Sequence, residues 1–293
     1  MTLKAEFFEA KWRLINIIEI TSLQNPKIKS VKALRYTKYR EKQNRFLVEG
    51  IRLVKEAIDC KAPIKMLLFC PDTLKSPTAL ELIDIVEKRG VECISVPSRV
   101  FDSISEKDNP QGIIAVVERL NLTLDSIEYN SQMLLVGAHE LRDPGNLGTI
   151  IRTADCAGAS GVIVTGISVD IFDPKTVRAT MGSIFSLPVV RVKEIGELKD
   201  WLFQNNIKMI ATSLSAKRYY FDLEYDEPVA IILGNEAEGL DAEILEYADE
   251  VVKIPMSGRA DSLNVASAAA IIIYEVVRQR MAKWQGGKRA REY

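Results

Sequence analysis

The chain has 293 residues, 47% hydrophobic and 27% charged, with a formal net charge of −1. This length and composition predict a globular protein of two medium domains rather than a disordered one. No apolar run approaches the roughly 20 residues of a membrane helix, and residues 1–19 carry acids within their apolar stretch. The four cysteines form no CxxC pair and there is one histidine. We therefore expect a cytoplasmic protein without a disulfide framework or a metal site.

Residues 1–19 could form an amphipathic N-terminal extension, to which we assign no function. From residue 20 short helices alternate with β-branched strands, which indicates a small α/β domain over 20–120. Its expected elements are helices around 50–59 and 78–89 and strands at 65–70, 91–96 and 112–117. The polar segment 121–131 is the expected linker.

The first domain is strongly basic at its beginning. Residues 27–45 hold eight lysines and arginines against one acid, Glu41, and Tyr36 and Tyr39 lie among them. Such a face suits phosphate groups. A solvated helix face would explain these charges equally well. The same alternative applies to the basic block that runs into the tail at 284–293. The candidate phosphate-binding side chains are Lys29, Lys32, Arg35, Lys38 and Arg40.

A second α/β unit is expected over 132–283, because strands and helices alternate throughout this stretch. The expected strands are 132–137, 161–164, 187–192, 208–212, 229–234 and 250–255; the helices are 147–157, 174–182, 195–205, 241–247 and 264–283. The alternation favours a mainly parallel sheet with helices on both faces. Ligands of such sheets bind beyond the carboxyl ends of the strands, so the loops after residues 137, 234 and 255 are the candidate sites.

The first candidate loop, residues 139–159, breaks at Pro144 and Gly145, and Asn146 could cap the following helix. Asn146 and Arg152 would then both lie near the start of that helix. A cap with a surface arginine is the simpler interpretation of this pair. His139, at the beginning of the loop, is interpreted as a packing or loop residue.

The second candidate loop, LGNEAEGL at 233–240, contains Gly234 at a strand end, then Asn235 and Glu236, and closes at Gly239. Glycines here would let a cofactor approach the backbone closely. A plain strand-to-helix turn would contain the same residues.

The third candidate loop follows a strand that ends at Pro255. Ser262 and Asn264 open a helix whose first turns are almost all small residues. Small side chains allow close packing against another backbone, in the same chain or in a second subunit. A capped core helix is the alternative.

Taken together, these loops resemble the three motifs of the SpoU (TrmH-type) family of RNA 2′-O-ribose methyltransferases, in the SPOUT superfamily. Asn146 and Arg152 match the first motif through NLGTIIR, and RATMGSIFSLP (178–188) resembles the family's connecting segment. The second motif matches at Gly234, Asn235, Glu236 and Gly239, and the third at Pro255, Met256, Ser262, Leu263 and Asn264. The departures are Ala237 and Ala266, where many members carry Gly and Ser.

The resemblance implies a C-terminal domain with a deep trefoil knot, a homodimer with composite active sites, and S-adenosyl-L-methionine as the cofactor. It also implies an N-terminal RNA-binding domain, because ITSLQNPKIK, FLVEGIRLVKEA and NPQGIIAVV resemble the substrate-binding domain of one branch of the family. The cofactor would be bound around Leu233, Gly234, Asn235, Gly239, Ile254, Pro255, Met256 and Leu263.

The resemblance also assigns the chemistry to Arg152. Arginine is a poor general base because its pKa is about 12 or higher, so we expect an electrostatic role, with the hydroxyl proton lost to a phosphate or to water. Asn146 would orient Arg152, Glu236 would hold Arg152 or the ribose, and Ser262 and Asn264 would shape the loop. No metal is needed for this transfer.

The expected substrate is a structured RNA, namely large-subunit rRNA, with tRNA as the alternative. A catalytically inactive RNA-binding module of the same fold is disfavoured because the motif residues are intact. A nucleotide-dependent oxidoreductase should show GxGxxG after its first strand, and GAHELRDPGNLG does not fit that pattern.

Overall fold

A computed structural model describes residues 17–74 and 76–289, with side chains described up to residue 283. Almost all of the N-terminal extension, residues 1–16, and residues 290–293 of the basic tail therefore lie outside the described residues. The chain divides into two compact units. The first comprises Met1–Leu120 with Phe172–Phe185, and the second comprises Asn121–Ile171 with Ser186–Tyr293.

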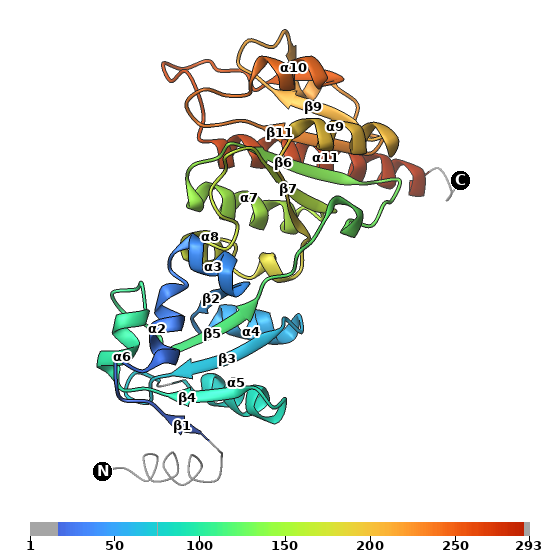
Figure 1. The fold of residues 1–293 in the computed structure, drawn as a ribbon. Coiled ribbons are helices and arrows are strands. Elements are labelled where there is room, and N and C mark those ends of the chain that lie inside the picture. Colours follow the sequence, from blue (N-terminus) through green and yellow to red (C-terminus); the bar gives the residue numbers. More distant parts are fainter. Residues whose placement is uncertain (1–16, 75, 290–293) are drawn as a thin grey trace. The chain divides into compact units, whose positions relative to one another are not determined.

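The first unit contains a five-stranded mixed sheet in the order β1-β4-β3-β5-β2. Its strands are β1 (Ile18–Glu19), β2 (Arg45–Glu49), β3 (Ile64–Phe69), β4 (Glu92–Ser95) and β5 (Ile113–Glu118). Its helices are α2 (Pro26–Ala33), α3 (Thr37–Gln43), α4 (Ile51–Asp59), α5 (Pro77–Lys88) and α6 (Ser98–Ile104). Helices α4 and α5 pack on one face of the sheet, and α2 and α6 on the other (Figure 1). The expected α/β composition of this region is confirmed.

One segment from the middle of the sequence packs with the first unit. Helix α8 (Pro174–Ala179) contributes Val177 to the core formed by α4 and α5. The rings of Phe172 and Phe185 lie against Phe46, with centroid distances of 4.7 and 6.3 Å. The sequence predicted the helix but placed it within the second α/β unit, because alternation along the chain does not show which core a helix joins.

The second unit is built on a seven-stranded parallel sheet in the order β10-β12-β9-β11-β6-β7-β8. Its strands are β6 (Leu134–His139), β7 (Gly161–Thr165), β8 (Val189–Val192), β9 (Lys208–Thr212), β10 (Arg218–Tyr219), β11 (Val229–Leu233) and β12 (Glu250–Lys253). Its helices are α7 (Pro144–Cys156), α9 (Ile195–Gln204), α10 (Ala242–Tyr247) and α11 (Val265–Arg289). The predicted parallel sheet is confirmed.

Helices cover both faces of this sheet (Figure 1). Helices α9 and α10 share one hydrophobic core with the strands, while α7 and α11 pack against each other and against β7 and β11. The segment predicted as a linker contributes Leu124 and Ile127 to the α9 and α10 core. Because most residues of this segment are polar, the sequence did not indicate that Leu124 and Ile127 would be buried.

None of the helices in the described part of the chain is both long and apolar enough to cross a membrane. The trefoil knot implied by the family resemblance stays a prediction.

Candidate active site

The three candidate loops follow β6, β11 and β12 at the carboxyl edge of the second sheet. Strands β6 and β11 are neighbours, and β9 lies between β11 and β12. Parallel strands deliver their following loops to one edge, so segments separated by more than a hundred residues meet there.

In the first loop, helix α7 begins two residues earlier than Asn146. Asp143 is its N-cap, and the Asp143 carboxylate accepts a hydrogen bond of 2.7 Å from the backbone N–H of Asn146. Pro144 occupies the first turn, where its missing N–H costs nothing. The expectation that Asn146 caps the helix is therefore wrong, and its amide is free for contacts with the other loops.

The second loop is a tight ring closed by its own backbone. Asn235 and Gly239 exchange two backbone hydrogen bonds of 3.0 Å. The Asn235 side chain accepts from the backbone N–H of Ala237 at 2.8 Å and donates to the carbonyl of Glu140 at 3.3 Å. Asn235 thus pins the loop to the end of β6. Ala237 does not adopt a positive φ, so the alanine that replaces the family's glycine is accommodated without strain.

Gly234 is required by the loop itself. A Cβ atom at this position would lie 2.3 Å from the carbonyl carbon and oxygen of Gly239, far inside van der Waals contact. The sequence interpretation assigned this glycine to close approach by a cofactor. Close approach by the loop's own backbone is the constraint that the structure shows.

In the third loop, Asn264 caps α11 and contacts the first loop at the same time. Its side-chain oxygen accepts from the backbone N–H groups of Ala266 and Ser267, at 2.9 and 3.3 Å. Its side-chain nitrogen donates to the Asn146 side-chain oxygen at 2.9 Å. The side-chain oxygen of Asn264 therefore fixes the start of α11, and its side-chain nitrogen fixes Asn146 in the first loop.

Asn146 completes a hydrogen-bonded chain through all three loops. Its side-chain nitrogen donates to the Glu236 carboxylate at 2.8 Å, while its oxygen accepts from Asn264. Arg152 lies on the exposed surface of α7, and among the described residues it takes part in no hydrogen bond or ion pair. Of the two partners expected for Glu236, Arg152 or the ribose, Arg152 does not pair with it; the Glu236 carboxylate accepts a hydrogen bond from Asn146. A contact of Glu236 with the ribose stays a prediction.

A pocket of about 500 Å³ lies beside this chain. Most of the expected cofactor residues line it: Leu233, Gly234, Asn235, Gly239, Ile254, Met256 and Leu263. Glu236 and Ser262 line it too, whereas Pro255 is not among the lining residues. The volume is in the range typical of small-molecule sites. The three acidic lining residues, Glu236, Glu238 and Asp261, outnumber the one lining lysine, Lys253, so the lining has a net negative character that suits a cationic ligand.

The sequence interpretation missed one wall of the pocket. This wall consists of Thr212, the last residue of β9, and of the next three residues, Ser213, Leu214 and Ser215. Their segment carries no motif, so residue type gave no signal. Only the strand order, which inserts β9 between β11 and β12, brings them to the site.

The basic segment of the first unit divides into exposed and buried cations. Lys29, Lys32 and Lys38 are exposed on α2 and α3, as is Tyr36. Arg35 is partly used internally, because its guanidinium donates to the carbonyl of Ile104 at 3.0 Å.

Arg40 has no exposed surface. Its guanidinium donates to the carbonyls of Leu34 and Arg35, at 3.0 and 2.7 Å, and lies 3.6 Å from the Asp173 carboxylate. Arg40 is therefore a structural residue, and its assignment to the phosphate-binding face is corrected. A buried arginine is identical to an exposed one in sequence, so charge counting could not separate them.

The C-terminal basic block is also largely engaged within its own unit. Arg278 donates two hydrogen bonds of 2.7 Å to Glu275, and these lower the pKa of the Glu275 carboxyl. Arg280 donates to the backbone carbonyls of Tyr225 and Glu227, at 2.9 and 3.0 Å. Lys283 pairs with Asp226. Arg280 and Lys283 therefore fasten α11 to its own unit, whereas the pair of Arg278 and Glu275 lies within the helix.

A parallel α/β unit with a pocket and a polar chain at the carboxyl edge of its sheet is the arrangement of a small-molecule-binding domain. Comparison with known proteins identifies its type. The model of the SpoU rRNA methylase family matches residues 133–274, and the model of the MRM3-like substrate binding domain matches residues 25–115.

The chain is also similar to individual members along most of its length. It is 37% identical to the 23S rRNA (guanosine(2553)-2′-O)-methyltransferase RlmP of Bacillus subtilis, over 88% of this chain and 98% of that protein. It is 37% identical to the 23S rRNA (uridine(2479)-2′-O)-methyltransferase of Streptomyces viridochromogenes, over 83% of this chain and 86% of that protein.

A solved structure agrees with these sequence matches. It is the SpoU methyltransferase AviRb from Streptomyces viridochromogenes in complex with AdoMet, with a TM-score of 0.83 and 36% identity over 88% of this chain and 99% of that one. The chain therefore belongs to the SpoU (TrmH-type) family of RNA 2′-O-ribose methyltransferases.

Proposed function

We propose that this enzyme transfers a methyl group from S-adenosyl-L-methionine to a ribose 2′-hydroxyl in large-subunit ribosomal RNA. The observation that carries the proposal is the chain of hydrogen bonds from Asn264 through Asn146 to Glu236 beside the pocket. It joins the three family motifs in one site. The similarity to two 23S rRNA 2′-O-methyltransferases favours ribosomal RNA as the substrate. Those relatives modify a guanosine and a uridine, as their names state, so the base is not proposed.

The pocket fits S-adenosylmethionine in size and character. Apolar side chains of Leu233, Ile254 and Met256 would contact the adenine, and the carboxylates of Glu238 and Asp261 would complement the positive charges of the cofactor. The bound cofactor supplies an activated methyl on a sulfonium, which is already a good leaving group. The protein's remaining tasks are to aim the hydroxyl and to stabilise its developing negative charge.

Arg152 is the group proposed for the charge. A guanidinium stays protonated in proteins, so it stabilises an alkoxide rather than removing a proton. The proton would leave to an RNA phosphate or to water. Because Arg152 has no partner among the described residues, its guanidinium is available to the RNA. Asn146 and Glu236 are positioning residues that hold the three loops in register.

Three further assignments belong to this proposal. RNA would be captured by the exposed lysines of α2 and α3. The enzyme would act as a homodimer through α11 with composite active sites, and it would work in the cytoplasm, where its RNA substrate is found. In α11, partly or fully exposed apolar side chains at Ile271, Tyr274, Val277 and Met281 recur at helical spacing and form one stripe.

The decisive experiment maps 2′-O-methylated nucleotides in total RNA from cells with and without the gene, and complements the deletion with wild type or Arg152→Ala. We expect one ribosomal site to lose its methyl group and only the wild-type gene to restore it. Loss at a tRNA position instead would replace the substrate assignment. No lost site in any RNA would contradict the proposed activity.

A further inference from the structure

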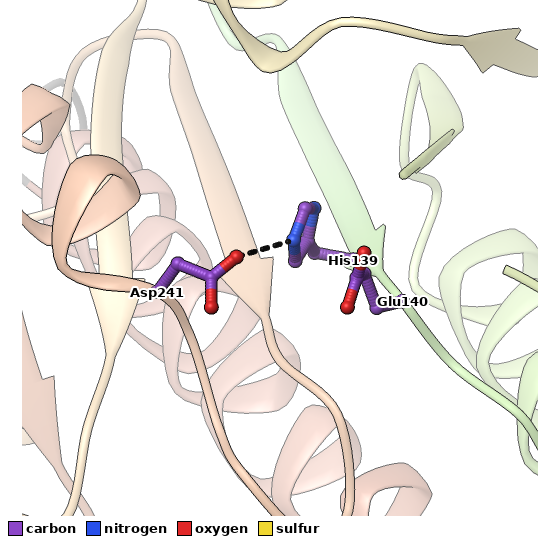
Figure 2. A group of neighbouring side chains, drawn as sticks. All are labelled: His139, Glu140 and Asp241. Atoms are coloured by element: carbon purple, nitrogen blue, oxygen red, sulfur yellow. Dashed lines mark ion pairs between the residues drawn. The ribbon is translucent and has the colours of Figure 1, made fainter. Parts of the chain in front are cut away.

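Three potential ligand side chains meet at the end of β6, behind the second loop. His139 ends the strand, Glu140 follows it, and Asp241 precedes α10. Their ligating atoms all lie within 4.8 Å of one another, and Figure 2 shows the three side chains gathered beside the strand end. The methyl-transfer proposal assigns none of them a task.

His139 supplies the observation that points to a ligand. The residue is 6% exposed, and its Nε2 is one of two buried side-chain polar atoms without a hydrogen-bond partner among the described residues. Asp241 Oδ2 lies 3.5 Å from this nitrogen, within ion-pair distance but outside hydrogen-bond geometry. Buried polar atoms are nearly always satisfied, so an unpaired nitrogen facing two carboxylates indicates a missing partner.

The other ring nitrogen is already occupied. Nδ1 lies 2.9 Å from the Thr165 hydroxyl, in a buried contact. When Nδ1 carries the proton and donates it to Thr165, the lone pair of Nε2 faces Asp241 and Glu140. Metal-binding histidines are oriented in this way, by a hydrogen bond from the nitrogen that does not bind the metal.

The backbone holds this arrangement in an uncommon conformation. Glu140 has a φ of 53°, in the left-handed region that few residues other than glycine adopt. Its N–H donates to the Thr165 carbonyl at 3.2 Å. A Cβ atom at Gly166 would lie 2.7 Å from Glu140 Cγ and 3.0 Å from His139 Cε1. Gly166 therefore leaves the space in which both side chains lie.

We propose that His139, Glu140 and Asp241 bind a divalent transition-metal ion, with Zn²⁺ as the best fit. One imidazole and two carboxylates suit Zn²⁺ better than Mg²⁺ or Ca²⁺, which prefer oxygen ligands alone. Two ligands of a tetrahedral zinc lie about 3.4 Å apart, close to the 3.5 Å between His139 Nε2 and Asp241 Oδ2. The Glu140 carboxylate lies within 4.8 Å of the other two ligand atoms, and a rotation of its side chain would bring it to bonding distance from the ion. Water would complete the coordination.

The ion would act as a clamp on the second loop. Asn235 at the start of the loop donates to the Glu140 carbonyl, and Asp241 directly follows its last residue, Leu240. The hydrogen bond of Asn235 holds the start of the loop at the end of β6, and an ion bound to Glu140 and Asp241 would hold the end of the loop at the same place. The expectation of no metal site rested on cysteine pairs and histidine number, and it could not anticipate three ligands that the fold brings together.

The test uses the full-length protein, first treated with a chelator and then titrated with Zn²⁺ alone in a calorimeter. We expect one Zn²⁺ per chain, a higher melting temperature, and slower backbone hydrogen exchange in the peptide containing residues 234–241. Co²⁺ as a substitute should give the visible absorption bands of a site with nitrogen and oxygen ligands. Mg²⁺ should bind more weakly than Zn²⁺.

The variants Asp241→Asn and Glu140→Gln keep the side-chain shape and remove the charge. Each should lower Zn²⁺ affinity at least about 10-fold. Asp241 is 69% exposed in its side chain, so its replacement should leave the fold intact. Asp200→Asn, an exposed aspartate on α9, is the matched control and should bind Zn²⁺ as wild type does. Absence of binding to wild type, or equal affinities in Asp241→Asn and wild type, would overturn the proposal. An equal loss in Asp200→Asn would do so too.

Discussion

At the scale of single residues, Arg152 and Gly234 matter for opposite reasons. Arg152 is exposed on α7 and is not held by a described neighbour, so the folded domain does not depend on it. Gly234 is enclosed by the backbone of its own loop, so a larger residue there would force the loop to shift. Replacing Arg152 should therefore affect turnover without affecting stability, and replacing Gly234 should affect the stability of the loop.

Arg152→Ala should lower turnover on the cognate RNA at least about 100-fold, because removing one preorganised charge stabiliser typically costs that much. Melting temperature and affinity for S-adenosylhomocysteine should stay at wild-type values. Arg152→Lys then tests geometry: partial recovery indicates charge alone, and little recovery indicates that the planar guanidinium fork is needed. Arg52→Ala, an exposed arginine on α4, is the control. Near wild-type turnover in Arg152→Ala would refute the assignment.

Gly234→Ala should destabilise the second loop, since its Cβ meets the Gly239 backbone at 2.3 Å. Overpacking of this kind costs about 1–3 kcal/mol. Urea unfolding should show the loss, and calorimetry should show weaker S-adenosylmethionine binding. Gly196→Ala in α9 is the matched control, because nothing lies within 4 Å of its added Cβ, and its stability should be equal to or slightly above wild type. Equal stabilities of Gly234→Ala and wild type would show that the loop can rearrange.

At the scale of elements, α2 and α3 carry the exposed lysines that we assign to RNA capture. The exposed side chains are Lys29, Lys32 and Lys38, whereas Arg40 is buried inside the first unit. The surface available to RNA therefore contains fewer cations than the sequence of residues 27–45 suggests. Arg40 supports the fold beneath this surface and does not contact RNA.

Replacing Lys29, Lys32 and Lys38 together with glutamine should weaken RNA binding and reduce the slope of log affinity against log salt by up to about 3, roughly 1 for each lost phosphate contact. Filter binding at several salt concentrations measures both. The control variant removes the same charge elsewhere on the first unit, by glutamine at Lys55, Lys61 and Lys88. It should leave the salt slope unchanged. Equal effects of the two triple variants would assign binding to net charge alone. S-adenosylmethionine affinity should not change in either variant.

At the scale of the whole molecule, the proposed homodimer through α11 can be tested directly. The expected dimer would cover the apolar stripe of α11, of which Tyr274 and Met281 are the most exposed members. A stripe of this kind on a helix is suited to a second copy of the same helix.

Wild type should sediment as a dimer in analytical ultracentrifugation, and Tyr274→Glu should shift it toward monomer because a carboxylate would be buried in an apolar contact. Activity should fall with dissociation if the active site is composite. Tyr129→Glu, at another exposed tyrosine of the second unit, should remain dimeric. A wild-type chain that is monomeric and fully active would contradict the composite site.

The sequence by itself determined the α/β class, the parallel second sheet and the family, and seven of the eight residues that it placed around the cofactor line the pocket. These follow from periodicity and from motifs whose residues are contiguous. Tertiary structure alone decided which core α8 joins, why Gly234 is needed, that Arg40 is buried, and that the loop after β9 forms a pocket wall. It also brought His139 and Asp241 together across a hundred residues. The physical reason is that local patterns set each element, whereas burial and strand order depend on contacts between residues that are distant in the chain.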